Sequence, residues 1–357
     1  MLFSPLTLGE LELSNRLVMA PLTRLRNGVE GVPGPLVAEH YRQRASLGLI
    51  VSEGTYPSQA GRSYPGQPGL VTPEQIAGWK KVTDAVHAEG GRIFAQIMHG
   101  GRVSHEDING GHRVVAPSAI AVEGETRTYK GKQAHPVPHE LSIDELPIVR
   151  EEIVTASRNA IEAGFDGVEL HSANGYLLHE FLAPNTNVRT DSYGGSPENR
   201  ARFVIETVNA VVEALGANRV GIRISPEHNV QGIEETDAAD VRATYEVLVN
   251  SIAPLDLAYL SILHADPTGD LVQDLRSRFN GTFLVNTGFG VITTREEALA
   301  LVADGHADAV VVGRPAIANP DLARRWREGL PLNEPDQSTF YGEGAQGYTD
   351  YPVYQPA

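Results

Sequence analysis

The sequence predicts a (β/α)8 TIM barrel, an α/β fold in which eight parallel strands alternate with helices. Short apolar runs rich in β-branched residues alternate with amphipathic helical patterns along the whole chain, which is typical of βα units around a parallel sheet. These strand-like runs number eight, as such a barrel requires. The 357 residues also suit a single domain over residues 1–357, because barrels of this kind use more chain per domain than most folds.

The expected elements follow one another with consistent end signals. Strands are expected at residues 17–20, 49–52, 92–97, 167–171, 220–225, 257–262, 283–286 and 309–312. Helices are expected at residues 73–88, 144–163, 199–215, 237–251, 294–303 and 320–328. Thr72 and Asn319 each precede a proline and read as helix-capping residues, while Gly90, Gly164 and Gly305 lie near helix ends.

Three segments lie outside the repeating βα pattern. Residues 6–13 alternate in polarity around a turn at Gly9 and Glu10, which predicts a hairpin that closes the barrel floor. Residues 98–141, after the third strand, are too long for a simple connection, so we expect an excursion over the active face. Residues 331–357 are rich in Gly, Pro and Tyr and are expected to form a tail that folds over the barrel.

Composition excludes several kinds of chemistry. The chain has no cysteine, which excludes disulfides, thiolate nucleophiles, cysteine-bound zinc and iron–sulfur clusters. The formal net charge of -16 disfavours nucleic acid and anionic membranes as partners, and no apolar run reaches the ~20 residues of a membrane helix. No metal site is expected, since His99 and His105 lack a nearby carboxylate in a ligand pattern. We therefore expect a cytoplasmic protein in which any redox chemistry depends on a bound organic cofactor.

The fourth expected strand runs directly into residues 171–176, which carry reactive side chains. His171 and Asn174 are three residues apart, a spacing that places both on one side of a helical turn, where their N–H donors can converge on one oxygen. Tyr176 can donate a proton from another direction. The alternative is a capped turn with a structural histidine and a packed tyrosine.

Two polar residues lie within otherwise apolar strands. Arg223 in the fifth strand must face a ligand or a carboxylate, because an unpaired buried guanidinium is costly; an ion pair with an internal Glu or Asp is the alternative. Gln96 ends the third strand, where its amide can pair with the donor and acceptor edge of a heterocycle.

The loops after the last two strands have the composition of a phosphate site. Gly288, Phe289 and Gly290 follow the seventh strand, and Gly313 and Arg314 follow the eighth. Many barrels bind phosphate at this place through backbone N–H groups, and Arg314 adds a charge-assisted contact. Two tight turns are the alternative.

A small basic cluster stands out in this acidic chain. It consists of Arg127, Lys130 and Lys132. It is either a solvated surface or a contact for an anionic dinucleotide.

The sequence resembles the old yellow enzymes, the FMN-dependent ene-reductase family, nearly from end to end. The most specific matching blocks are residues 171–178 (HSANGYLL) and 187–200 (NVRTDSYGGSPENR). Further matches are residues 19–24, 53–54, 95–99, 313–314 and 319–322. The ending, residues 340–345 and 347–352, resembles the bacterial branch that includes pentaerythritol tetranitrate, N-ethylmaleimide and morphinone reductases.

This resemblance implies a flavoprotein with FMN at the top of the barrel. A nicotinamide dinucleotide, NADPH or NADH with NADPH favoured by the resemblance, would reduce the flavin, and an alkene conjugated to a carbonyl or nitro group would oxidise it. His171 and Asn174 would bind the substrate oxygen, and Tyr176 would protonate the carbon opposite hydride transfer from flavin N5.

The resemblance also implies residues that hold the cofactor and the substrate. Thr23 would bond the flavin carbonyl, Gln96 and Arg223 the pyrimidine edge, and Pro21 and Gly54 would contribute backbone contacts. Gly288, Phe289, Gly313 and Arg314 would hold the phosphate end. Met98 and Tyr341 would line the substrate pocket.

Two departures from the family pattern bear on function. Relatives usually carry Trp where this chain has Met98, so we expect an altered substrate range. The cysteine that the other main branch has at the position of Thr23 is absent.

Alternatives to an ene-reductase stay open at this point. They are a nitrate-ester or nitro-compound reductase on the same flavin, a flavin-free lyase or isomerase of phosphorylated substrates, and a flavin protein without alkene chemistry. The expected assembly is a monomer or a homodimer.

Overall fold

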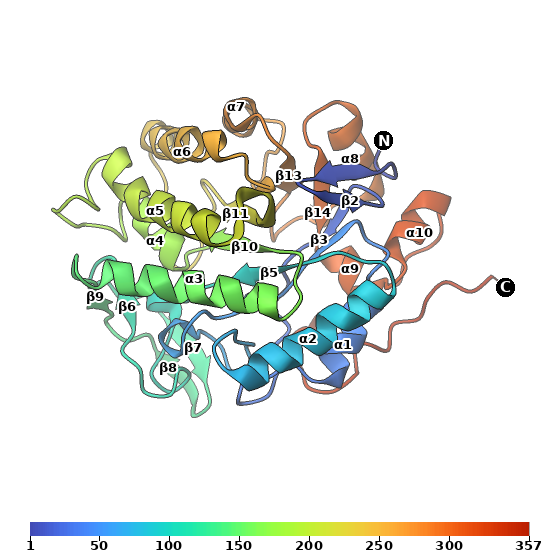
Figure 1. Cartoon of the computed structure of the whole chain (residues 1–357), viewed down its shortest axis with the longest axis horizontal. Coiled ribbons are helices and arrows are strands. Elements are labelled where there is room, and N and C mark those ends of the chain that lie inside the picture. The colour runs from blue at the N-terminus through green and yellow to red at the C-terminus, as the bar shows by residue number, and fades with distance from the viewer. Residues whose placement is uncertain (357) are drawn as a thin grey trace.

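A computed structural model describes residues 1–356 and contains a closed barrel of eight parallel strands surrounded by helices (Figure 1). The barrel strands are β3 (Leu17–Met19), β4 (Leu49–Val51), β5 (Ile93–Ile97), β10 (Gly167–Ser172), β11 (Val220–Ile224), β12 (Tyr259–Leu263), β13 (Phe283–Asn286) and β14 (Ala309–Val312). Pairing of Val310 in β14 with Leu17 in β3 closes the ring. The predicted fold class is confirmed, and each expected strand agrees with an observed one to within two residues.

The helices are more numerous than the sequence pattern predicts. They are α1 (Pro35–Arg42), α2 (Pro73–Ala88), α3 (Leu146–Glu162), α4 (Leu177–Leu182), α5 (Pro197–Leu215), α6 (Ala238–Ile252), α7 (Asp270–Phe279), α8 (Arg295–Ala303), α9 (Arg314–Ala318) and α10 (Leu322–Glu328). All six expected helices are present, and α1, α4, α7 and α9 were not predicted. These four have at most ten residues each, too few for a clear helical period. Within the described residues, no helix combines the length and apolar character needed to cross a bilayer.

Capping explains where the long helices begin. Thr72 accepts the N–H of Gln75 in a capping box at the start of α2, as the sequence predicts. The corresponding prediction for Asn319 is wrong, because α10 begins only after Asp321 and Asn319 instead ends α9. The Asn319 side chain donates to the carbonyls of Pro315 and Asn333, so it ties α9 to the chain that follows α10.

The N-terminal hairpin closes the barrel floor. Strands β1 (Leu6–Leu8) and β2 (Leu11–Leu13) pair antiparallel, and Leu8 and Leu13 pack into the same apolar cluster as Phe94 and Tyr259 from inside the barrel. Gly221 makes room there, since a Cβ on it would lie 2.5 Å from the Tyr259 ring. The lower interior is thus a filled apolar core, which leaves the carboxyl ends of the strands free for chemistry.

Short strands form in the long segment after β5. They are β6 (Val115–Ala116), β7 (Glu125–Thr128), β8 (Gly131–Ala134) and β9 (His139–Glu140). β7 and β8 make an antiparallel hairpin, which lies beside the barrel in Figure 1. This hairpin carries the basic cluster, and its Arg127 lines the cavity described next.

Candidate active site

A cavity of about 730 Å³ opens at the carboxyl ends of the barrel strands. Its volume lies in the range typical of small-molecule and cofactor sites. Thirteen of the fourteen predicted site residues line it: Pro21, Thr23, Gln96, Met98, His171, Asn174, Tyr176, Arg223, Gly288, Phe289, Gly313, Arg314 and Tyr341. Gly54 is not among the described residues that line the cavity; it lies behind Met98 and Gln96, where a Cβ would come 2.5 Å from the Met98 sulfur.

His171 and Asn174 reach the cavity from a strand end and the turn after it. His171 belongs to β10, and Asn174 follows with a left-handed φ of 58°, so the predicted helical turn is wrong although both residues line the same cavity. In the described structure neither side chain forms a hydrogen bond with the protein, and His171 Nδ1 and Asn174 Oδ1 are buried without partners. Burial, with a smaller contribution from Arg223, holds the pKa of His171 well below its usual value. The two residues therefore present a neutral imidazole and an amide to a ligand.

Tyr176 is paired with a second tyrosine that the sequence did not reveal. Its hydroxyl lies 2.9 Å from the Tyr64 hydroxyl, and its ring meets the His171 ring edge-on at 5.0 Å between centroids. Burial raises the pKa of Tyr176, so the hydroxyl keeps its proton at neutral pH. Gln231 also lines the cavity and donates to the Asn174 carbonyl at 2.7 Å.

Arg223 lines the cavity, and one of its N–H donors has no hydrogen-bond partner in the described structure. Arg223 donates to Ser261 at 3.2 Å and to Asn286 at 3.1 Å, both neutral side chains, and its Nε has no partner in the described structure. The internal carboxylate is Glu169, which accepts from Gln96 at 2.8 Å. Burial lowers the pKa of Arg223 and the charge of Glu169 opposes this, so the guanidinium is electrostatically supported yet free to bond a ligand.

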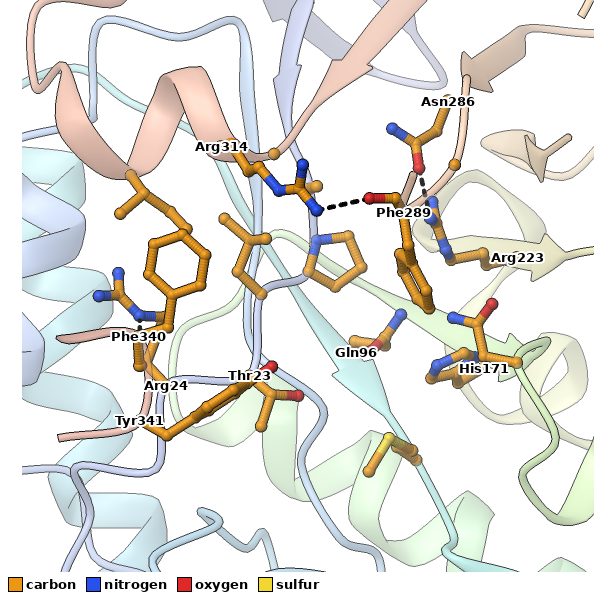
Figure 2. Close-up of a pocket in the computed structure, with 18 of the residues that line it drawn as sticks. Thr23, Arg24, Gln96, His171, Arg223, Asn286, Phe289, Arg314, Phe340 and Tyr341 are labelled. Atoms are coloured by element: carbon orange, nitrogen blue, oxygen red, sulfur yellow. Dashed lines mark hydrogen bonds between the residues drawn. The ribbon is translucent and has the colours of Figure 1, made fainter. Parts of the chain in front are cut away.

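A second arginine lines the cavity at the carboxyl end of β14. Arg314 Nη2 donates to the Phe289 carbonyl at 2.6 Å, and Figure 2 shows this bond and the bond between Arg223 and Asn286. Gly288 has a φ of 103°, which a side chain would strain, and Gly313 precedes the first turn of α9. An anion at this end would meet the Arg314 charge.

The loop after β3 brings Thr23 to the cavity, and a buried carboxylate holds that loop. Glu53, two residues after β4, accepts the backbone N–H groups of Arg24 and Leu25 at 3.0 and 3.1 Å and the side-chain amide of Asn27 at 3.1 Å. Leu25 has a φ of 61°, a conformation that such bonds help to maintain. Glu53 therefore supports the segment on which Thr23 lies.

The same loop anchors the C-terminal tail. Arg24 donates to the carbonyls of Phe340 and Gly347 at 3.0 and 2.7 Å, and its guanidinium lies 5.0 Å from the centroid of the Tyr348 ring. Figure 2 shows Tyr341, the neighbour of Phe340, on the same side of the cavity as Thr23. The tail thus contributes Phe340 and Tyr341 to the lining of the cavity.

The cavity as a whole suits a flat heterocycle with an anionic tail, such as FMN. Gln96 and the unpartnered Arg223 Nε offer donors to a polar ring edge, Pro21 offers an apolar surface, and Arg314 offers a charge for a phosphate. These residues would hold the cofactor, and His171, Asn174 and Tyr176 line the same cavity.

A buried carboxyl behind the cavity gives a pH-dependent prediction. Burial raises the pKa of Glu180 in α4 from 4.5 to about 8, although its Oε1 accepts the Arg102 N–H at 2.9 Å. Because the folded-state pKa is the higher one, the stability that this group contributes is complete below pH 4.5 and is lost as the pH rises through 8. Glu180→Gln stays neutral, so it is expected to raise the free energy of unfolding by about 5 kcal/mol above pH 8 and by little at pH 5. Urea unfolding at both pH values measures this difference, and a variant no more stable than the parent above pH 8 would contradict it.

Several known proteins are similar to this chain in sequence and in structure. The sequence model of the NADH:flavin oxidoreductase / NADH oxidase family matches residues 1–333. A probable flavin mononucleotide-dependent alkene reductase of Leishmania infantum is 42% identical over 360 residues, which cover 98% of this chain and 97% of that protein. The old yellow enzyme homologue of Zymomonas mobilis superposes with a TM-score of 0.93 at 39% identity and 99% coverage of both chains. Morphinone reductase in complex with tetrahydroNAD gives a TM-score of 0.93 at 45% identity, covering 99% of this chain and 98% of that one.

Proposed function

The chain belongs to the NADH:flavin oxidoreductase / NADH oxidase family, and on that premise we propose that it is an FMN-dependent alkene reductase of the old yellow enzyme type. Its substrates are alkenes activated by a conjugated carbonyl or nitro group, and its hydride donor is NADPH. FMN, held by Gln96, Arg223 and Arg314, would supply hydride transfer from the nicotinamide dinucleotide to the alkene. The relative from Leishmania infantum carries the alkene reductase name, and the structure of morphinone reductase was solved with a nicotinamide dinucleotide analogue.

One observation carries the proposal for the substrate site. His171 and Asn174 line the same cavity as the Tyr176 hydroxyl, and within the described residues the protein satisfies neither side chain. A carbonyl or nitro oxygen that accepts from both would gain stabilisation as negative charge develops on it. The neutral state of His171 suits this role, because a neutral donor binds the oxygen without transferring its own proton.

Proton delivery is the task that we assign to Tyr176. With its pKa raised by burial, its hydroxyl remains a donor throughout the neutral range. The adjacent Tyr64 hydroxyl at 2.9 Å orients the Tyr176 hydroxyl and can stabilise the phenolate that proton transfer leaves behind. The alkene carbon next to the activating group would receive this proton.

Arg127 supports a phosphorylated dinucleotide as the donor. It is the member of the basic cluster that lines the cavity, whereas Lys130 pairs with Asp107 at 2.5 Å. A cation at the cavity mouth of a protein with net charge -16 favours the donor with the extra 2′-phosphate. Stopped-flow reduction with NADPH and NADH at matched concentrations compares the two.

Product analysis tests the proposal against its nearest alternative. Incubation with NADPH and 2-cyclohexenone is expected to give cyclohexanone in amounts equal to the NADPH consumed. A parallel incubation with a nitrate ester would release nitrite if that chemistry were the faster one. Consumption of NADPH that depends on the nitrate ester, with no cyclohexanone formed from the enone, would overturn the alkene reductase.

Met98 is expected to set the size of substrate that the site accepts. Its side chain is buried against Val103, Val122 and Tyr176, beside the position that the alkene would take. Met98→Trp adds a rigid ring to this wall, so we expect roughly tenfold lower kcat/KM with bulky enones and little change with 2-cyclohexenone. Steady-state kinetics on a series of enones of increasing size measures the effect. Equal turnover of bulky enones by variant and parent would count against it.

A further inference from the structure

A buried network of His179, Glu235 and Tyr245 lies directly behind the turn that carries Asn174 and Tyr176. The roles assigned to the cavity residues make no use of it. We propose that His179 is a positioning residue for that turn, and that Glu235 and Tyr245 hold its ring in the tautomer that accepts the Gly175 N–H. The inference rests on the proposed function for its catalytic consequence, but the positioning itself is a property of the protein alone.

The bond from His179 to the turn defines which ring nitrogen carries the proton. His179 Nδ1 lies 3.0 Å from the backbone nitrogen of Gly175. A backbone N–H can only donate, so Nδ1 must accept and the proton must sit on Nε2. His179 is fully buried, so water cannot replace this acceptor.

The far side of the His179 ring meets groups that match this tautomer. His179 Nε2 lies 3.2 Å from Glu235 Oε1 and 3.1 Å from the Tyr245 hydroxyl, which itself donates to Glu235 Oε1 at 3.0 Å. Burial and the nearby charge of Glu235 raise the pKa of Tyr245 well above its usual value, so this hydroxyl remains a donor. The carboxylate thus receives two donors on one oxygen.

Glu235 extends the network to the loop between β11 and α6. Its Oε2 accepts the Glu227 N–H at 2.8 Å, and its own N–H donates to Asn229 Oδ1 at 2.7 Å. This loop carries Gln231, whose amide donates to the Asn174 carbonyl. The network therefore joins both sides of the turn.

The turn needs such support because its backbone is strained. Asn174 has a φ of 58° and Gly175 a φ of 81°. A Cβ on Gly175 would lie 2.8 Å from Gln231 Cβ, so the β11–α6 loop packs directly on the turn. Gly175 adopts this conformation without strain, but a non-glycine residue such as Asn174 keeps it only where its surroundings hold it. Without the His179 acceptor, the Gly175 N–H would be buried and unsatisfied, and the turn would relax.

Three variants separate positioning from general destabilisation. His179→Leu removes both bonds of the ring, whereas His179→Asn keeps an acceptor at the place of Nδ1 and loses the link to Glu235. Tyr245→Phe removes only one hydroxyl. His87→Leu is the matched control, because His87 also pairs with a carboxylate, Asp166 at 3.0 Å, but at the amino end of β10.

Two readouts are expected to move together. Amide hydrogen exchange of the peptide spanning residues 174–177, in the purified protein as isolated, is expected to rise at least tenfold in His179→Leu and to stay close to the parent in His179→Asn. The kcat/KM for 2-cyclohexenone is expected to fall roughly ten- to a hundredfold in His179→Leu and to recover most of that loss in His179→Asn. His87→Leu is expected to match the parent in both readouts. Exchange in α5 is expected to be the same in every variant as in the parent.

The outcomes are distinct for the two proposals. Parent-like exchange and turnover in His179→Leu would overturn the positioning role, and so would equal losses in His179→Leu and His179→Asn. If His179→Leu fails to fold, the test uses the other two variants. Exchange at residues 174–177 that is faster in His179→Asn than in both Tyr245→Phe and the parent would then overturn the positioning role. A parent protein that reduces no enone would refute the proposed function, while the exchange measurements would still decide the role of His179.

Discussion

Tyr176→Phe is expected to slow oxidation of the reduced enzyme by 2-cyclohexenone by about 10²–10⁴-fold, with flavin reduction by NADPH changed by less than about threefold. The variant keeps the ring that packs against His171 but loses the hydroxyl that lies 2.9 Å from Tyr64. Reduction of the flavin needs no proton from this residue, whereas completion of alkene reduction does. The effect should therefore fall on one half-reaction.

Anaerobic stopped-flow absorbance measures the two half-reactions separately. Tyr64→Phe is the matched control, since it removes the neighbouring hydroxyl and leaves the Tyr176 proton in place; a loss of no more than about tenfold is expected. Unchanged half-reactions in Tyr176→Phe would mean that Tyr176 is not the donor or that protonation does not limit the rate.

His171→Phe is expected to lower kcat/KM for 2-cyclohexenone by about 10²–10³-fold, because one donor to the developing oxyanion is lost. The phenyl ring keeps the edge-on packing with Tyr176, so the cavity should retain its shape. Arg223 and Gln96 are untouched, and FMN content should equal that of the parent. His171→Gln restores an N–H donor and is expected to recover part of the activity.

Steady-state kinetics and the flavin absorbance of the purified variants measure this result. A drop in activity matched by a drop in FMN content would assign His171 to the cofactor. Full activity in His171→Phe would contradict the substrate-oxygen role. Asn174→Asp provides an independent check, because it removes the other N–H donor, and aspartate tolerates the left-handed φ of this position.

The barrel could be predicted because its signals are local. Each strand is a short apolar run, and Thr72 and Gly90 mark the ends of α2 through bonds and dihedral angles within a few residues. The placement of His171 and Arg223 at the cavity could also be predicted, because a polar side chain in a buried strand must face something polar. The topology of a parallel barrel then brings strand ends together.

Contacts between distant loops could not be predicted. Tyr64 lies 112 residues before its partner Tyr176, and Glu53 supports the Thr23 loop through backbone groups that no residue type marks. The role of His179 could not be predicted for the same reason, because it depends on a contact with Glu235, 56 residues away in the sequence. The capping prediction for Asn319 failed for a different reason. An Asn before Pro can end one helix as well as begin the next, and Asn319 ends α9.

An anaerobic visible spectrum of the purified protein, followed through addition of NADPH and then of 2-cyclohexenone, tests the central claim most directly. Flavin bands that bleach with NADPH and return with the enone are the predicted result, and they would establish cofactor, donor and reaction type together. A colourless protein that takes up no added FMN, or flavin bands that stay bleached after the enone, would contradict an FMN-dependent alkene reductase.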